Sequence, residues 1–151
     1  MSVKTVLITP PFTQLNTPYP ATSYLKGFLD TKGVTSVQYD LSIELFNKVF
    51  TRDFIARAFQ EAQDFNGVEF PLVRKQKAQY INCVNIVTRF LRNQDVKTAE
   101  QLVAEGFLPK AHRREGALDI AYFDLDVIDQ AKHLGTLFIE ELGDFIAANV
   151  D

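Results

Sequence analysis

The sequence predicts an α/β fold in which residues 1–40 form a strand, a helix and a second strand, and residues 41–151 are mainly helical. Three patterns indicate this. Residues 3–8 form a nearly continuous apolar run, residues 20–32 carry apolar side chains at helical spacing, and a second short apolar run follows at 34–39. Apolar residues then recur at helical spacing to the end, so we expect one folded unit of 151 residues that is helix-rich overall.

The first strand is expected over Val3 to Ile8, with the sequence V-K-T-V-L-I. A β-branched run with little alternation is typical of a strand buried on both faces of a parallel sheet. Pro10 and Pro11 end this strand, because proline donates no hydrogen bond to a neighbouring strand.

A helix is expected to follow, since Pro20 suits the first turn of a helix and Gly33 suits the residue after its end. The side chains predicted to be buried by this helix are Ala21, Tyr24, Leu25, Phe28 and Leu29.

The second strand is expected over Val34 to Tyr39, ending at Asp40. Two strands joined by one helix pair in parallel, through a right-handed crossover. A stable sheet usually has at least three strands. We therefore expect either that residues 120–125 supply a third strand or that the chain is an incomplete domain.

Helices are expected through the rest of the chain. Asp40 or Ser42 caps the first, and Thr51 caps the second. A long helix spans about 71–91, and the last covers 128–150. Between them, Thr98 and Gln101 form a capping box for a short helix.

Composition narrows the function class. The single cysteine, Cys83, can form no internal disulfide, zinc cluster or iron–sulfur site, which favours a reducing cytoplasm. The 16 basic and 19 acidic residues give a net charge of −3, which argues against nucleic-acid binding. No apolar run reaches the ~20 residues that cross a bilayer, and residues 1–11 do not resemble a signal peptide, so no membrane partner is expected.

The segment after the first strand is the candidate ligand loop. Ligands of open α/β sheets bind outside the carboxyl ends of the strands, which places residues 9–19 and Asp40 at the expected site. Four prolines and no glycine lie between positions 10 and 20, so the loop differs from glycine-rich phosphate loops. Its hydroxyl and amide side chains suit a large, weakly charged, partly apolar ligand. The alternative is that the prolines only shape a turn.

Residues 5–29 read T-V-L-I-T-P-P-F-T-Q-L-N-T-P-Y-P-A-T-S-Y-L-K-G-F-L. This run resembles the start of the cobalamin-binding domain of cobalamin-dependent radical S-adenosylmethionine enzymes. Those domains begin with a strand, a Pro-Pro pair, a further proline and a helix, and their next strand ends in Asp, as at Asp40. The similarity covers about the first 40 residues, and the helical remainder resembles in length an insert that some members carry before their third strand.

The resemblance implies a flavodoxin- or Rossmann-like sheet that holds cobalamin across its strand ends, beside a downstream catalytic barrel. The positions that it implies as cofactor-facing are Pro10, Pro11, Thr13, Gln14, Asn16, Thr17 and Asp40. The chain has neither a Cys-x-x-x-Cys-x-x-Cys nor an Asp-x-His-x-x-Gly motif. The iron–sulfur cluster and S-adenosylmethionine are therefore expected only in the downstream domain, and cobalamin binding by this chain alone is expected to be weak or absent.

The other groups of polar or reactive residues are explained better by structural roles than by functional sites. Asp126, Asp129 and His133 could hold a metal but fit a solvated acidic face better, and the basic cluster at 110–114 fits a solvated loop. Cys83 lies on an apolar helix face, which favours an inert buried thiol. No catalytic residue is assigned.

Two other function classes stay open. One is a helical protein–protein interaction module with a small βαβ element. The other is a stand-alone flavodoxin-like enzyme, which requires three or more strands. An incomplete sheet has unpaired strand edges, so we also expect a homodimer or a strand-swapped contact.

Overall fold

The computed structural model describes residues 5–11, 20–62, 70–110, 112–115, 122 and 124–149. The chain forms two compact units, residues 1–49 and residues 50–151. The first holds all the described β-structure and the second is helical, so each is treated separately below.

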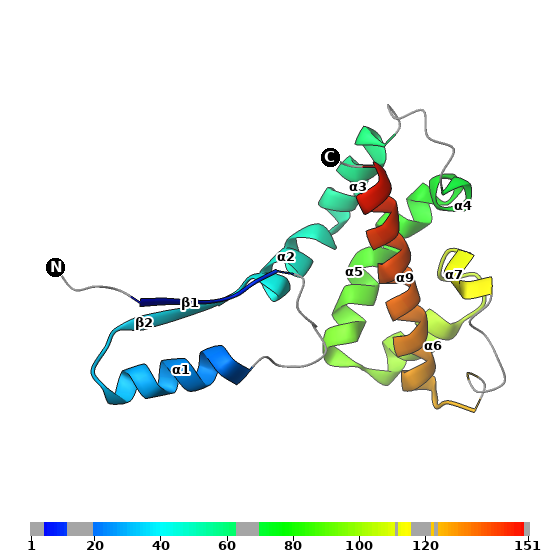
Figure 1. The fold of residues 1–151 in the computed structure, drawn as a ribbon. Coiled ribbons are helices and arrows are strands. Elements are labelled where there is room, and N and C mark those ends of the chain that lie inside the picture. Colours follow the sequence, from blue (N-terminus) through cyan, green and yellow to red (C-terminus); the bar gives the residue numbers. More distant parts are fainter. Residues whose placement is uncertain are drawn as a thin grey trace. The chain divides into compact units, whose positions relative to one another are not determined.

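The first unit has the order β1 (Thr5–Thr9), α1 (Pro20–Thr31), β2 (Ser36–Asp40) and α2 (Leu41–Val49), shown at the blue and cyan end of the chain in Figure 1. The two strands pair in parallel with Thr5 opposite Ser36 and Thr9 opposite Asp40. The predicted strand, helix and strand are therefore confirmed, as a two-stranded parallel sheet.

The expected third strand is not found among the described residues. Of residues 120–125, Tyr122 is helical and residues 124–125 form a turn and a bend, so the prediction is wrong for them, while 120, 121 and 123 lie outside the described residues. The sheet described here has the two strands β1 and β2. A stand-alone flavodoxin-like enzyme therefore lacks the three strands that it requires within the described part of the chain.

Helix α1 packs on one face of this sheet through polar side chains. The hydroxyl oxygens of Thr9 and Thr22 are 3.4 Å apart, and the Gln38 amide donates to the Thr22 hydroxyl at 2.7 Å. Thr9 and Gln38 belong to the same face because paired residues of parallel strands share a face and side chains alternate along each strand. The opposite face carries the side chains of Val6, Ile8, Val37 and Tyr39, which are apolar apart from the Tyr39 hydroxyl.

The predicted burial of the first strand and of the first helix is wrong. Val6 and Ile8 are 48% and 52% exposed, so β1 is not covered on both faces. Of the predicted apolar set of α1, Leu29 is half-buried, whereas Ala21, Tyr24, Leu25 and Phe28 are exposed. The reason is that the side of α1 that carries Thr22 faces the sheet, so the side that carries Tyr24, Leu25 and Phe28 is on the outside.

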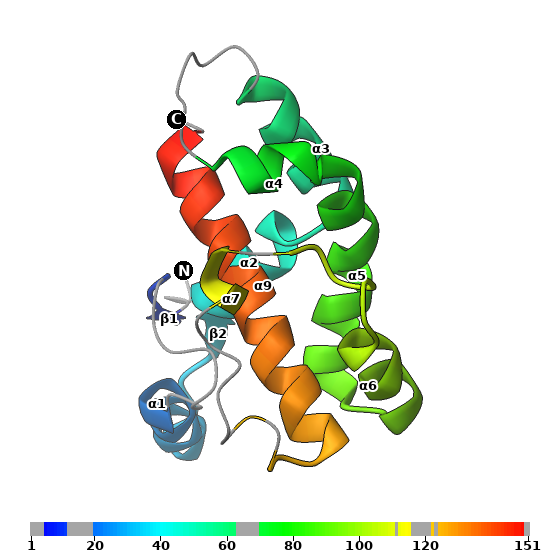
Figure 2. The same cartoon turned by 90° about the vertical axis from the view of Figure 1, so that its right-hand side faces the viewer.

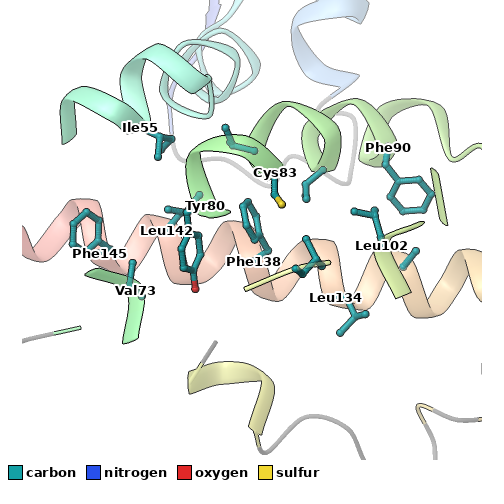
Figure 3. Packing of buried hydrophobic residues seen from close by; sticks show 14 of the residues in the cluster. Ile55, Val73, Tyr80, Cys83, Phe90, Leu102, Leu134, Phe138, Leu142 and Phe145 are labelled. Carbon is teal, nitrogen blue, oxygen red and sulfur yellow. The ribbon is translucent and has the colours of Figure 1, made fainter. Parts of the chain in front are cut away.

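The second unit contains the helices α3 (Arg52–Glu61), α4 (Pro71–Lys75), α5 (Lys77–Asn93), α6 (Val96–Val103), α7 (His112–Glu115) and α9 (Val127–Asn149). The long α9 runs beside α5 and α6 in both views (Figures 1 and 2). Among the described residues, the side chains that form its core include Ile55, Phe59, Val73, Tyr80, Cys83, Val84, Val87, Phe90, Leu102, Leu134, Phe138, Leu142 and Phe145 (Figure 3).

Aromatic contacts join the helices of this core. The rings of Phe59 and Phe145 have centroids 4.6 Å apart, and Tyr80 stacks on Phe138 at 5.1 Å. These pairs link α3, α5 and α9. The apolar stripes predicted for the segments 51–62, 80–91 and 134–146 meet in this core. Leu91 and Ile146 are half-buried and pack against it, and Leu137 is half-buried.

Two details of the helical region differ from prediction. The segment 71–91 is broken at Gln76, whose side-chain amide donates to the Lys110 carbonyl at 2.7 Å and accepts from the Lys110 N–H at 2.8 Å. The cap of α6 is Asp95 instead of Thr98, because the Asp95 carboxylate accepts from the Thr98 N–H at 2.9 Å. That hydrogen bond lowers the pKa of Asp95.

The predicted caps Thr51 and Asp40 are confirmed. The Thr51 hydroxyl accepts from the Phe54 N–H at 3.3 Å, and the Asp40 carboxylate accepts from the Ile43 N–H at 3.1 Å. Each satisfies a backbone donor that the first turn of a helix leaves unpaired.

The two glycines of α9 predict opposite responses to substitution. Gly143 faces open space, so Gly143→Ala is expected to raise the free energy of unfolding of the second unit by about 0.5–1 kcal/mol through helix propensity. At Gly135 a Cβ atom would lie 3.3 Å from Leu91 Cδ2 and 3.4 Å from Val87 Cγ1. Gly135→Val is expected to lower that free energy by about 1–3 kcal/mol, because it overfills this contact.

Urea unfolding followed by circular dichroism measures both changes. Equal effects of the two substitutions would contradict the close packing of α5 and α9 at Gly135.

Candidate functional site

The carboxyl ends of β1 and β2 bring together the candidate residues that the structure describes. Thr9 and Asp40 are paired at the ends of the two strands, and Pro10 and Pro11 continue directly from β1 with exposed side chains. The other four predicted site residues, Thr13, Gln14, Asn16 and Thr17, lie outside the described residues. Of the predicted site residues, the structure thus brings Pro10, Pro11 and Asp40 together at the carboxyl ends of the two strands.

A cluster of hydroxyl and amide groups lies on the α1 side of this edge. Thr22 is at its centre, with Thr9 Oγ1 at 3.4 Å and Gln38 Nε2 at 2.7 Å. The Gln38 amide also lies 3.4 Å from the Ser23 hydroxyl. Thr22 and Ser23 belong to the first turn of α1, whose backbone N–H groups favour a ligand oxygen. We call Thr9, Thr22, Ser23 and Gln38 the hydroxyl–amide cluster.

The start of the candidate loop is anchored to α2. The Ser42 hydroxyl donates to the Pro10 carbonyl oxygen at 2.9 Å, and Asp40 accepts from the backbone of α2 through one carboxylate oxygen. Asp40 therefore serves as a helix cap, and the contact from Ser42 fixes where the chain leaves β1.

Sequence reasoning missed the cluster, although two signals were available. Gln38 is a polar residue between the apolar residues of a strand. Thr22 precedes Leu29 by two helical turns, so the two side chains lie on the same face of α1. Read together, they indicate that the face between α1 and the sheet is polar.

The side chains of this site can bind a ligand through hydrogen bonds. Residues 1–49 include no histidine and no cysteine, so this unit offers neither an imidazole base nor a thiolate. Its hydroxyl and amide groups both donate and accept, and the exposed Ile8 and Tyr39 add apolar surface on the other face of the sheet. Such a set suits a neutral ligand rich in amide or hydroxyl groups.

The second unit has a cavity of about 660 Å³ lined by Phe70, Pro71, Leu72, Val73, His112, Arg113, Glu141 and Asp144. Its charged groups are engaged in hydrogen bonds and ion pairs within the unit. Glu141 is 2% exposed and accepts from the backbone N–H groups of His112 and Arg113 at 2.9 and 3.3 Å, while the Arg113 guanidinium pairs with Glu140 and Asp144. These contacts hold α7 against α9, which gives the charged groups a structural role.

Burial shifts the pKa of two other groups of the second unit. Burial raises the pKa of the Cys83 thiol, which agrees with the prediction of an inert cysteine. Burial, and the nearby Glu141 carboxylate, raise the pKa of Tyr80. Its hydroxyl has no hydrogen-bond partner among the residues described, and its oxygen points away from the stacked Phe138 ring (Figure 3).

The acidic side chains near the start of α9 are engaged in contacts of their own. Asp126 accepts from the Asp129 N–H at 2.9 Å as a cap, Asp129 pairs with Lys132 at 2.8 Å, and the His133 ring lies 5.8 Å from that of Tyr122. In the described part of the chain, no three His, Cys, Asp or Glu side chains are grouped to hold a metal ion.

Comparison of the chain with protein-family models, with curated proteins and with solved structures gives no match. Among the helices described here, none combines the length and the apolar character needed to span a membrane.

The central role of Thr22 leads to a testable expectation. Thr22→Val keeps the shape of the side chain but removes the hydroxyl that Gln38 and Thr9 contact, at a cost of about 1–2 kcal/mol to the packing of α1 on the sheet. Amide hydrogens of β1 and β2 are then expected to exchange about five- to thirty-fold faster.

Hydrogen exchange read by mass spectrometry over residues 5–9 and 36–40 measures this change. Thr35→Val, which replaces an exposed hydroxyl in the loop before β2, is the matched control and is expected to leave exchange unchanged. Equal exchange rates in the two variants would contradict the role given to Thr22.

Proposed function

We propose that this chain is the N-terminal part of the cobalamin-binding domain of a radical S-adenosylmethionine enzyme and is itself non-catalytic. In this proposal the β1–α1–β2 unit begins a flavodoxin-like sheet, and the iron–sulfur cluster and S-adenosylmethionine belong to a downstream catalytic domain. The observation that supports it best is the gathering of polar side chains at the carboxyl ends of two parallel strands, directly where the Pro-Pro pair follows β1.

The residues present fit the periphery of such a cofactor. Cobalamin is large and carries many amide groups, for which the exposed side chains of Ser23 and Gln38 are suitable partners, while the buried Thr22 holds the Gln38 amide in place. Residues 1–49 have no histidine, so no imidazole of this unit would ligate the cobalt. When bound, cobalamin supplies the organometallic chemistry, and the chain's own residues bind and orient it.

The first experiment reads the gene beyond the codon for Asp151 and titrates the full-length protein with hydroxocobalamin. A Cys-x-x-x-Cys-x-x-Cys motif is expected downstream in the same frame, together with a cobalt-dependent change of the absorption spectrum that saturates at one cofactor per chain. A full-length protein without the motif, or one that leaves the spectrum unchanged, would contradict the proposal.

The same titration tests Asp40. Asp40→Ala removes both the charge and the cap of α2, whereas Asp40→Asn keeps a capping side chain. If Asp40 faces the cofactor, both variants are expected to weaken cobalamin binding by about three- to ten-fold, the worth of one hydrogen bond. Recovery of full affinity in Asp40→Asn would show that the carboxylate acts only as a cap.

A second candidate is a helical protein–protein interaction module with a small βαβ element. The observation in its favour is that the second unit builds a complete apolar core, while the first unit exposes Tyr24 and Phe28 at 77% and 58%. This function predicts a stoichiometric complex with another protein in which these two side chains are protected from solvent. Cobalamin binding by the full-length protein, with Tyr24 and Phe28 exposed to solvent throughout, would exclude it.

A further inference from the structure

The outer edge of β1 is open in the described part of the chain. β1 pairs with β2 on one side, and no described strand pairs with its other side. An open strand edge is a row of unpaired backbone donors and acceptors that can pair with another chain. A two-stranded sheet also falls short of the three strands that independent stability usually requires.

The direction of the backbone hydrogen bonds shows which residues face this edge. The Thr5 N–H donates to the Thr35 carbonyl oxygen at 3.1 Å, so Thr5 is turned toward β2. Backbone groups alternate along a strand. Leu7 and Thr9 are therefore also turned toward β2, whereas the N–H and C=O groups of Val6 and Ile8 point outward.

The sequence of β1 is complementary to itself in the reverse direction. It reads T-V-L-I-T, so two antiparallel copies centred on Leu7 place threonine opposite threonine, Val6 opposite Ile8 and Leu7 opposite Leu7. None of these residues is charged, and pairs of β-branched side chains are favourable cross-strand neighbours. When the two copies are centred on Leu7, both outward-facing residues, Val6 and Ile8, pair with outward-facing residues of the other copy. A register centred nearer the carboxyl end would pair Pro10, which has no N–H to donate.

We propose that the outer edge of β1 is a homodimer interface at which two copies pair antiparallel about Leu7, Val6 of each facing Ile8 of the other. The resulting sheet has the order β2, β1, β1 of the second copy and β2 of the second copy. The proposal concerns the chain of 151 residues. In the longer protein of the proposed cofactor function, a downstream strand would take this edge of β1 instead, because a flavodoxin-like sheet has the strand order 2-1-3-4-5.

The edge of β2 is the weaker alternative. The same symmetric pairing there would place Ser36 opposite Asp40, and Asp40 is already engaged as the cap of α2. α2 also begins directly at Leu41, which ends the extended backbone.

The dimer also extends the apolar face of the sheet. Val6 and Ile8 are about half-exposed in one copy, and in the pair each gains an apolar side chain of the second copy beside it on the same face. The antiparallel arrangement puts the two carboxyl ends of β1 at opposite ends of the interface. Pro10, Pro11 and Asp40 therefore lie outside the strand pairing in both copies.

Charge exchange at the facing pair tests this register. In Val6→Lys/Ile8→Lys, lysines oppose lysines, and in Val6→Glu/Ile8→Glu, glutamates oppose glutamates. Each double variant alone is expected to be monomeric or to dimerise at least about tenfold more weakly, because directly opposed like charges are destabilising. An equimolar mixture is expected to recover a heterodimer, since lysine then faces glutamate.

Light scattering after size exclusion measures the mass, with twice the 17.1 kDa of one chain expected for the unmodified protein. Ile43→Lys/Leu45→Lys, which charges two exposed apolar side chains of α2, is the control and is expected to stay dimeric. A monomeric unmodified protein would overturn the proposal, as would a mixture of the charged variants that forms no heterodimer.

Self-cross-linking gives a second measurement that does not depend on charge. In a Cys83→Ala background, Leu7→Cys places two cysteines opposite each other across the symmetry axis, at a non-hydrogen-bonded position whose Cα separation of ~4.5 Å allows a disulfide. Thr5→Cys faces Thr9 instead. Oxidation is expected to cross-link the first variant and not the second, and the reverse pattern would overturn the register.

Discussion

Thr22 lies between Thr9 and Gln38, and its hydroxyl is the point at which helix α1 is fastened to the two-stranded sheet. Because this contact is polar, the face of the sheet under α1 is the polar one. Among the described residues of the first unit, the buried side chains are Thr9, Thr22, Ser36 and Ser42, all of which carry hydroxyls. Most apolar side chains of β1, β2 and α1 are consequently on the outside, the half-buried Leu7 and Leu29 excepted. This reversal explains both the polar cluster at the strand ends and the apolar surface that the unit exposes.

The second unit is built as helical cores usually are, with apolar side chains inside and polar ones outside. Its apolar stripes face inward, and polar contacts join its helices, such as those of the half-buried Arg74, which donates to the Ala62 carbonyl at 2.6 Å and to the Asn149 side chain at 2.5 Å. The contrast supports different roles for the two units. A buried helical core can be stable by itself, whereas a parallel pair of strands with a half-exposed apolar face and an open edge usually requires further surface.

Sequence periodicity was sufficient to predict most helices and the order of β1, α1 and β2, because apolar spacing and capping residues are local signals. It failed where a partner distant in sequence decides the outcome. The break at Gln76 depends on Lys110, and the orientation of α1 depends on Gln38, neither of which a helical pattern contains. At the candidate site, the place could be predicted from the rule for parallel sheets. Thr22 and Gln38 could not, because apolar spacing assigns the Tyr24 and Phe28 side of α1 to the sheet.

The central claim is that the first unit is completed by surface from outside itself, at the edge of β1. Hydrogen exchange at the amides of Val6 and Ile8, measured over a hundred-fold range of protein concentration, tests it most directly. The account predicts that protection of these two amides rises with concentration while that of residues 83–90, in the helical core, stays constant. Exchange at Val6 and Ile8 that is the same at every concentration would contradict it.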